Sequence, residues 1–534
     1  MYVKKSLIAI LLSAGLFVTA APGFAVTAEE ILEVLVNKGI INRTEYEILL
    51  KGPSKATGQP EAQAAQPAPA GESKKAESVA EQPQAKPDAK TTTTNKSGVG
   101  ELTATFKDGV SWESKDKSTM ISLHGRILPD YRNFLGNDAI GADTFDIRQA
   151  QLWVDGRFYD DYEFRVRADF VSLAGPQASV CTNVNASGVC TTTQVPTSQS
   201  AQLFDAYINY AGWKAAQIRF GQLRVPYSFE LLEAIPYFDF YERSFAGSFD
   251  PSFDRGIMMH GSLTKGLWYG LSYTNGNSRN VVDSNEVVDS KDTSGRLAVN
   301  FAELFGQKDA IYHLGLNYTH GRTTTAGAVP SVRTEARGVR FFAPLDFAAD
   351  DVVRNRAALE AVVAYGPMKF ASEYFNFNYS GQTNAAMPVS FDRDIKSYYL
   401  SLLWLVTGEH YADSYNLGRM GRLRPTNNFV MGKSCCGAFE LGLRYSKFDA
   451  SDFPSIAPSA SNPGTGAIRD TGSAVANAWT LGVKWILNPN TRLLLNYTKT
   501  DFGKDIRLTT SGNPSKVTDT REERAITVRG SFDF

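Results

Sequence analysis

The most regular feature of this sequence is an alternation of apolar and polar positions over short segments. From Tyr162 to Phe170 every second residue is apolar or small, and the residues between them are charged. A period of two predicts a strand with one apolar and one polar face. A soluble, half-buried strand has the same local pattern, so its recurrence along the chain decides between the two interpretations. The pattern recurs in about sixteen segments, at 119–131, 145–158, 162–171, 201–211, 215–223, 255–263, 267–275, 294–301, 310–319, 356–365, 369–379, 396–407, 438–448, 475–487, 491–499 and 522–534.

The connections between these segments alternate between short and long. Short turns at one end of a strand array and long loops at the other are typical of a transmembrane barrel, whose short turns face the periplasm. Residues 408–437 depart from this rule, because they are long where a periplasmic turn is expected. Tight turns are expected at 159–161, 212–214, 264–266, 366–368 and 488–490, and long loops at 172–200, 224–253, 276–293, 320–355, 380–395, 449–474 and 500–521.

Three segments precede the predicted barrel of residues 101–534. Residues 1–25 combine a basic start, an apolar core and a small-residue end, which predicts a cleaved secretory signal peptide rather than an anchor. Residues 26–51 have a helical pattern, which predicts short periplasmic helices that associate between subunits or dock on the barrel. Residues 52–100 are poor in large apolar residues and predict a disordered linker. No later run is apolar enough for a spanning helix, so only a closed barrel could cross a membrane.

Composition adds three points to this picture. The formal net charge is −1, which gives no reason to expect a nucleic-acid partner. The 23 tyrosines and 32 phenylalanines suit a protein that fills aromatic girdles at two membrane interfaces. The four cysteines fit an oxidising compartment, and a local disulfide is expected between Cys181 and Cys190. Cys435 and Cys436 are adjacent, so a bond between them would be strained.

Four stretches within 101–534 carry a resemblance to a known family. They are Phe145–Leu152 with Asp161–Arg165, Asp169 and Phe170; Phe220–Tyr227 with Tyr241–Ser244 and Asp254–Gly256; Tyr398 and Tyr399 with Trp404–Glu409; and Gly437–Leu441 with Arg444–Ser446, Gly482–Trp485 and Asn488–Asn490. In this order and spacing they resemble the phosphate-selective porin O/P family of Gram-negative outer membranes. The final residue, Phe534, is similar to the terminal aromatic of barrels that the assembly machinery inserts.

This resemblance implies a sixteen-stranded and usually trimeric barrel, with loops and a long periplasmic segment folded into the lumen. The unusual length of 408–437 fits that implication. The resemblance also implies passage of phosphate or related anions along walls lined with arginine and lysine.

Anion passage requires cationic side chains that face the lumen and hold an anion weakly. Arginine suits phosphate because its guanidinium forms two parallel bonds and stays charged. The alternation predicts that Arg165, Arg167 and Arg219 point inward, and Arg296 as well, while Arg444 and Lys484 lie on strands that match the family. Alternatively, these side chains pair with carboxylates on a wet wall and contact no solute.

Two connections are expected to shape the pore. Residues 224–253 follow the fifth predicted strand, which makes them the third loop on the exterior side. They are rich in aromatic and acidic residues, which predicts a constriction packed against the inner wall. Residues 408–437 carry Arg419, Arg422, Arg424 and Lys433, which would place positive charge in the lumen or form a solvated periplasmic surface. The acids of the first connection either brace lumen arginines or make the pore permissive to cations. Its candidate constriction residues are Glu230, Glu233, Tyr241, Glu242 and Arg243.

Together these observations predict an all-β, outer-membrane porin that passes small anions such as phosphate without a cofactor. Its expected partners are the lipid bilayer, lipopolysaccharide, small anionic solutes and two further copies in a homotrimer. A general or cation-tolerant diffusion porin and a plugged structural or adhesive barrel are the alternatives. No nucleophile-elbow, phosphate-loop or zinc-protease motif occurs, and the five histidines have no ligand-like spacing, so no enzyme activity is expected.

Overall fold

The computed structural model describes residues 102–534 apart from 107, 137–142, 172–177, 185–189, 196–200, 277–290, 324–328, 345–351, 383–388, 434–435, 454–467, 470–471 and 510–516. Side chains are not described at 178–184, 190–195, 323, 468–469, 509 and 517. The signal peptide, the N-terminal helices and the linker predicted for residues 1–100 therefore lie outside the described residues. So do the side chains of Cys181, Cys190 and Cys435.

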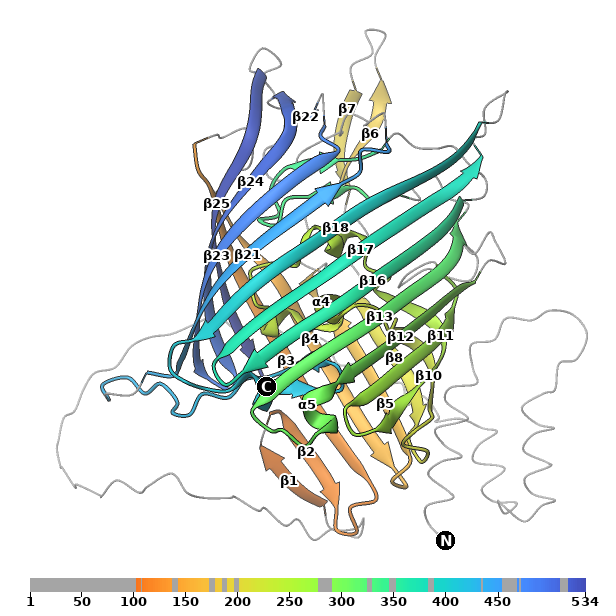
Figure 1. Cartoon of the computed structure of the whole chain (residues 1–534), viewed down its shortest axis with the longest axis vertical. Helices are drawn as coiled ribbons and strands as arrows, with labels where there is room; N and C mark the ends of the chain where they lie inside the picture. Colours follow the sequence, from red (N-terminus) through yellow and green to blue (C-terminus); the bar gives the residue numbers. More distant parts are fainter. Residues whose placement is uncertain are drawn as a thin grey trace, which may run out of the picture. The chain divides into compact units, whose positions relative to one another are not determined.

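Sixteen antiparallel strands form a closed barrel, which confirms the predicted fold class and strand number (Figure 1). Each strand pairs with the next, and the last pairs back with the first. In ring order they are β3 (Met120–Phe134), β4 (Thr144–Phe158), β5 (Tyr162–Asp169), β8 (Gln202–Tyr210), β9 (Gln217–Arg224), β10 (Phe253–Thr264), β11 (Leu267–Thr274), β12 (Asp292–Asn300), β13 (Ala310–Thr323), β16 (Val352–Tyr365), β17 (Met368–Gln382), β18 (Ser390–Leu405), β21 (Ala438–Asp449), β23 (Val475–Asn488), β24 (Thr491–Thr509) and β25 (Val517–Asp533).

The barrel closes where β25 meets β3. Phe532 pairs with Ile127, and the terminal Phe534 exchanges backbone hydrogen bonds with Gly125 at 3.0 and 3.1 Å. A Cβ atom at position 125 would lie 2.5 Å from the Phe534 ring, so glycine is required there. Phe534 therefore completes the seam, and the sixteen described wall strands leave no open edge to meet lipid.

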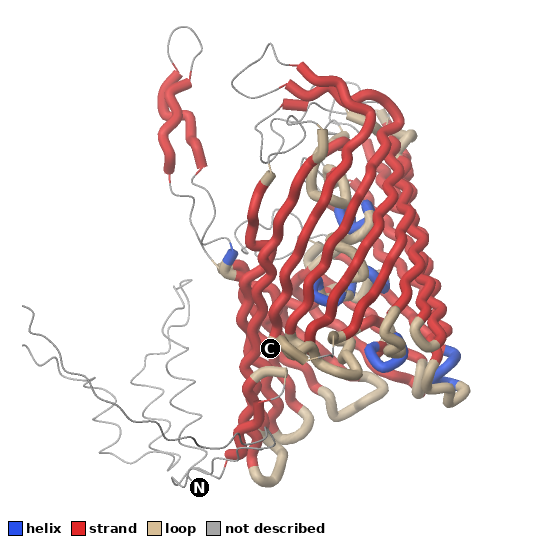
Figure 2. The backbone as a smooth tube through the Cα atoms, turned by 90° about the vertical axis from the view of Figure 1, so that its left-hand side faces the viewer, coloured by secondary structure: helices blue, strands red, loops and turns tan. Residues whose placement is uncertain are grey.

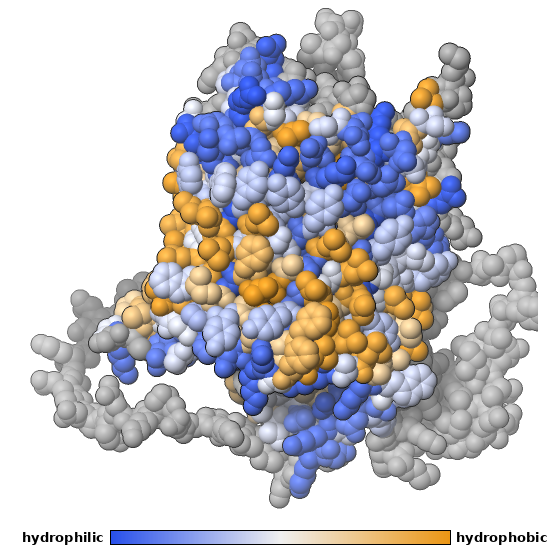
Figure 3. Space-filling model, in the orientation of Figure 1, coloured by the Kyte–Doolittle hydropathy of each residue, from blue (hydrophilic) through white to orange (hydrophobic). Residues whose placement is uncertain are grey.

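The two faces of the wall differ as the alternation predicts. On β18, Leu400, Leu402 and Trp404 are 43%, 50% and 46% exposed, whereas the intervening Ser401 and Leu403 are buried. Apolar side chains form a broad band on the outer surface with hydrophilic residues beyond it (Figure 3). Such a band requires hydrocarbon around it. Within the described residues, no helix is long and apolar enough to span a bilayer.

The remaining elements are short. β1 (Leu102–Phe106) pairs with β2 (Val110–Ser114), which pairs with the start of β3 and extends the sheet beyond the periplasmic end (Figures 1 and 2). The others are β6 (Ala178–Val184), β7 (Cys190–Val195), β14 (Val332–Arg333), β15 (Arg340–Phe342), β19 (Tyr415–Asn416), β20 (Arg419–Met420), β22 (Ile468–Arg469), the helices α4 (Phe229–Leu232) and α5 (Phe301–Leu304), and the 3₁₀ turns η2 (Ile235–Tyr237), η3 (Phe245–Phe249) and η5 (Tyr411–Ser414).

Candidate functional site

The connection from β9 to β10, residues 225–252, folds into the barrel, and we call it the first insert. Its helix α4 lies inside the ring of strands (Figures 1 and 2). Glu373 on β17 accepts hydrogen bonds from the backbone N–H groups of Phe229 at 2.9 Å and Glu230 at 2.8 Å. Lys369 on the same strand donates to Asp239 at 2.6 Å. The inner wall thus anchors the start of the insert by satisfying its backbone donors.

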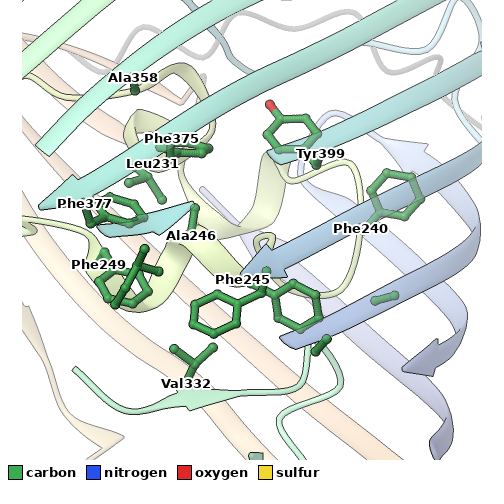
Figure 4. Close-up of a cluster of buried hydrophobic side chains, with 14 of the residues drawn as sticks. Leu231, Phe240, Phe245, Ala246, Phe249, Val332, Ala358, Phe375, Phe377 and Tyr399 are labelled. Carbon is green, nitrogen blue, oxygen red and sulfur yellow. The ribbon is translucent and has the colours of Figure 1, made fainter. Parts of the chain in front are cut away.

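Aromatic side chains of the first insert pack against the wall and against one another (Figure 4). The rings of Phe249 and Phe377 stack with centroids 4.3 Å apart. Phe240 lies over two wall glycines, where a Cβ atom at Gly442 or Gly482 would approach its ring to 3.0 or 3.2 Å. The insert is therefore a packed part of the protein core, and it narrows one side of the lumen.

This close approach predicts that Gly442→Val destabilises the barrel by about 1–3 kcal/mol, because overpacking forces the Phe240 ring to move. Thermal unfolding in detergent micelles would measure the loss. Gly295→Val is the matched control, since a Cβ there meets only the flexible end of Leu271 at 3.3 Å. Equal unfolding temperatures for the two variants would contradict the packing described for Phe240.

The acids of the first insert brace the wall arginines. Glu242 pairs with Arg148 on β4 at 2.6 Å and with Arg529 on β25 at 3.0 Å. Burial raises the pKa of Glu242, but these two guanidinium groups outweigh it and hold that pKa well below its ordinary value. Glu230 accepts from the backbone and hydroxyl of Ser244 at 2.8 and 2.7 Å. These carboxylates are neutralised by partners and contribute little negative field to the lumen.

The other three candidate constriction residues are also held within the insert. Arg243 does not pair with Glu242; it pairs with Asp250 at 3.3 Å and donates to the Glu233 carbonyl at 3.2 Å. Burial and the charge of Asp239 raise the pKa of Glu233 well above its ordinary value. Tyr241 is 1% exposed.

A second insert, residues 329–344, enters from the exterior between β13 and β16. Phe341 packs edge-on against Phe448 with centroids 5.5 Å apart, and Glu335 pairs with Arg444 on β21 at 2.7 Å. The same arginine pairs with Glu230 of the first insert at 3.3 Å. Arg444 therefore ties both inserts to one strand.

A third insert, residues 408–433, enters from the periplasmic end. The Tyr411 hydroxyl donates to Glu440 on β21 at 2.8 Å, and Arg296 on β12 donates to the Gly418 carbonyl at 2.6 Å. These wall contacts place the part around 411–422 inside the barrel. Of the two alternatives left open by the sequence, the position in the lumen is therefore the one observed for this part. Arg422 and Arg424 both pair with Asp108 at the β1–β2 turn, Arg422 also with Asp533, and Lys433 is exposed.

Three of the six candidate lumen cations lie beneath the inserts. Arg296 pairs with Glu360 at 2.7 Å, and neither side chain is exposed. Lys484 pairs with Glu440 at 2.6 Å, with its side chain 8% exposed, and Arg444 is buried between the inserts. All three side chains point inward, as expected, but each contacts a carboxylate instead of the open lumen.

Arg165, Arg167 and Arg219 lie on strands β5 and β9, and their side chains are only partly buried. Arg165 pairs with Asp155 at 2.5 Å and its side chain is 37% exposed. Arg167 pairs with Asp205 at 2.6 Å and is 16% exposed. Arg219 stacks on Tyr207 at 4.2 Å, and among the described residues it has no ion pair.

Arg419 of the third insert joins Arg165 and Arg219, and we call these three the lower basic cluster. Burial and the charges of Arg165 and Arg219 lower the pKa of Arg419, although its surface is open to solvent. No carboxylate in the described part of the chain pairs with it. The sequence identified Arg419 as part of a basic run but gave no sign that it meets strands β5 and β9.

A second crowded group, the upper basic cluster, lies towards the exterior and was missed by the sequence analysis. Burial and the charges of Arg340, Arg337 and Arg132 lower the pKa of Arg333 to about 10. Arg132 and Arg337 share Asp146 at 3.6 and 3.4 Å. Two of these four arginines therefore share one carboxylate, and Arg337 also lies 3.9 Å from Asp130. In the described residues, no group of three or more histidine, cysteine or acidic side chains could hold a metal ion.

A closed barrel of sixteen strands with inserts folded into its lumen defines the class of outer-membrane porins. The chain belongs to the family described as phosphate-selective porin O and P, whose profile matches residues 121–527. Its family and fold are those of channel proteins of the outer membrane. No curated protein matches the chain.

Solved porins have a similar fold at low identity. OmpT of Vibrio cholerae, in a trimer form, is 12% identical, with a TM-score of 0.43 and coverage of 78% of this chain and 100% of that one. DcaP of Acinetobacter baumannii is 11% identical, with a TM-score of 0.42 and coverage of 79% and 99%. OprB of Pseudomonas putida is 9% identical, with a TM-score of 0.43 and coverage of 78% and 94%. Similarity at this level carries no functional argument.

Proposed function

We propose that this porin is a passive channel for small anions such as phosphate. The observation that carries the proposal is the lower basic cluster, in which Arg219 and Arg419 face the lumen without a carboxylate partner among the described residues. Uncompensated positive charge in a narrow bore raises the local anion concentration. Arginine also offers the paired donors that an oxyanion accepts.

The way in which the charged residues pair supports the same proposal. Acids of the first insert are paired with Arg148, Arg444 and Arg529, so they do not offset the open arginines. Arg165 and Arg167 each keep one carboxylate partner, which weakens their hold on an anion. A passing anion would meet the upper basic cluster, then Arg167 with its paired Asp205, then the lower basic cluster. Binding of this staged and weak kind allows release as well as entry.

Titration of the chloride conductance with phosphate in planar bilayers tests the proposal against its alternatives. An anion pathway with oxyanion sites predicts that millimolar phosphate reduces the single-channel chloride current. A general or cation-tolerant porin would conduct chloride without such inhibition. A plugged barrel, for which the three packed inserts are the favouring observation, would give no steady conductance steps.

We further propose a homotrimer in a leaflet of lipopolysaccharide, exported by means of a cleaved signal peptide at residues 1–25. Strands β5, β8 and β9 have 8, 9 and 8 residues, at or below the roughly 9–11 residues of a strand that spans alone. Neighbouring copies of the chain would cover the part of the wall that these three short strands form. Cross-linking in native membranes would test the trimer, and a mature N-terminus other than Val26 would contradict the proposed cleavage.

A further inference from the structure

The outer surface of β18, β21, β23, β24 and β25 carries three stacked rows of side chains above the apolar band. The lowest is an aromatic row, in which Tyr398 and Tyr445 have centroids 6.1 Å apart and Tyr445 and Trp479 4.9 Å apart. Rings of this kind mark the boundary between hydrocarbon and headgroups. The aromatic row, named from β18 to β24, is Tyr398, Tyr445, Trp479 and Tyr497.

Two residues farther towards the exterior on these strands stands a basic row. Because side chains alternate, each lysine of this row shares the outward face with the aromatic residue of its own strand, and Arg524 lies opposite Lys499 in the strand register. Lys396, for example, lies on the face of Tyr398 and Trp404, while the intervening Ser397 is buried. The basic row is Lys396, Lys447, Lys499 and Arg524, with Asn477 in the corresponding place on β23.

Two residues farther again stands an acidic row. Lys499 contacts Asp501 at 3.0 Å and Glu522 at 3.2 Å, and Arg524 contacts Glu522 at 3.1 Å. These side chains are 38–47% exposed, so the ion pairs are held in water and exchange readily for another partner. The acidic row is Asp394, Asp449, Asp501 and Glu522.

The rows follow one level of the membrane. In the strand register Tyr398 lies opposite Lys447, and Trp479 opposite Lys499, so the rows shift by two residues at these steps. Such a shift compensates for the tilt of the strands, which is visible in Figure 1. Figure 3 shows the same order on this face, from the apolar band through pale aromatic residues to hydrophilic ones. An arbitrary scatter of surface charge would not keep this spacing on β18, β21 and β24, each of which carries all three rows.

We propose that this face binds lipopolysaccharide, with the basic row contacting its lipid phosphates and the acidic row sharing the divalent cations that bridge them. Charge complementarity favours a phosphorylated lipid, because the side chains of the basic row lie just above the aromatic row, at the level of the phosphates of the outer leaflet. Carboxylates one step farther out would repel a bare phosphate, but they bind it through magnesium or calcium. This binding proposal rests on the proposed lipopolysaccharide leaflet, and it does not depend on the anion selectivity of the channel.

The test compares binding of purified lipopolysaccharide to the full chain in neutral detergent with 1 mM magnesium. Lys396→Glu/Lys447→Glu/Lys499→Glu is expected to weaken binding at least tenfold. The matched control reverses three exposed lysines at the periplasmic end, Lys214→Glu/Lys265→Glu/Lys308→Glu, and is expected to bind like the unmodified chain. Gel mobility before and after heating verifies that each barrel is folded.

Three further arms separate the sources of binding. Dephosphorylated lipopolysaccharide should bind weakly, inorganic phosphate should not compete at millimolar concentration, and chelation of magnesium should weaken binding several-fold. Equal binding by the triple variant and the unmodified chain, or by phosphorylated and dephosphorylated lipid, would overturn the proposal. An absence of any chelation effect would overturn the role of the acidic row. Failure of the anion-channel proposal would show instead in the conductance of the unmodified chain, which neutral-lipid bilayers measure.

Discussion

Charge reversal of Arg219 and Arg419 is expected to lower the chloride-to-potassium permeability ratio by about tenfold. The double variant changes the lumen by four charge units. A unit charge about 10 Å from the ion path is worth about 0.4 kcal/mol in water before salt screens it. The sum is about 1–2 kcal/mol, and 1.4 kcal/mol corresponds to a factor of ten. The reversal potential in a potassium chloride gradient measures this ratio directly.

The matched control for this experiment is Lys396→Glu/Lys447→Glu, which changes the total charge equally on the lipid-facing surface. In bilayers of neutral lipid it should leave the reversal potential unchanged. If both double variants shifted the potential alike, overall charge rather than the lower basic cluster would set selectivity. If neither shifted it while both remained folded, the cluster would have no part in selectivity.

Removal of the Arg444 side chain is expected to destabilise the barrel by about 3–5 kcal/mol, the usual result of leaving buried carboxylates unpaired. Its guanidinium holds Glu335 at 2.7 Å and Glu230 at 3.3 Å, and its side chain is 3% exposed. Because it ties two inserts to the wall, Arg444→Ala should also give larger and noisier single-channel currents. Unfolding in detergent and bilayer recording measure the two effects.

Arg507→Ala is the control, because Arg507 forms an exposed ion pair with Asp519 at 2.9 Å, with the side chains 54% and 50% exposed. It should unfold within about 0.5 kcal/mol of the unmodified protein, as surface substitutions usually do. A purely solute-contacting role for Arg444 makes the opposite prediction. In that case Arg444→Ala would alter selectivity and leave stability near that of the control.

The strands could be predicted from the sequence because membrane and lumen act on every one of them locally. All sixteen expected segments overlap strands of the barrel. The errors fall at the ends: β16 begins at Val352 rather than 356, and β24 extends to Thr509 rather than 499. Outside the hydrocarbon both faces meet water, so the period of two fades before the strand ends. The β1–β2 hairpin was missed for the same reason, since neither of its faces is buried.

The sequence predicted the direction in which the candidate side chains point, but not the groups with which they pair. Alternation predicted that Arg165 and Arg296 lie on the inner face, and their ion pairs with Asp155 and Glu360 agree. Whether an inward arginine meets water or a carboxylate depends on which insert covers it. Arg444 and Glu335 are 109 positions apart, and no local pattern records such a pair. Arg419 joined the lower basic cluster for the same non-local reason.

The reversal potential of the unmodified porin, in bilayers of neutral lipid with a potassium chloride gradient, tests the central claim most directly. That claim is that uncompensated arginines govern the lumen field. It predicts a potential shifted towards the equilibrium value of chloride, and the shift should shrink as salt screens the arginines. A potential shifted towards the equilibrium value of potassium would contradict it.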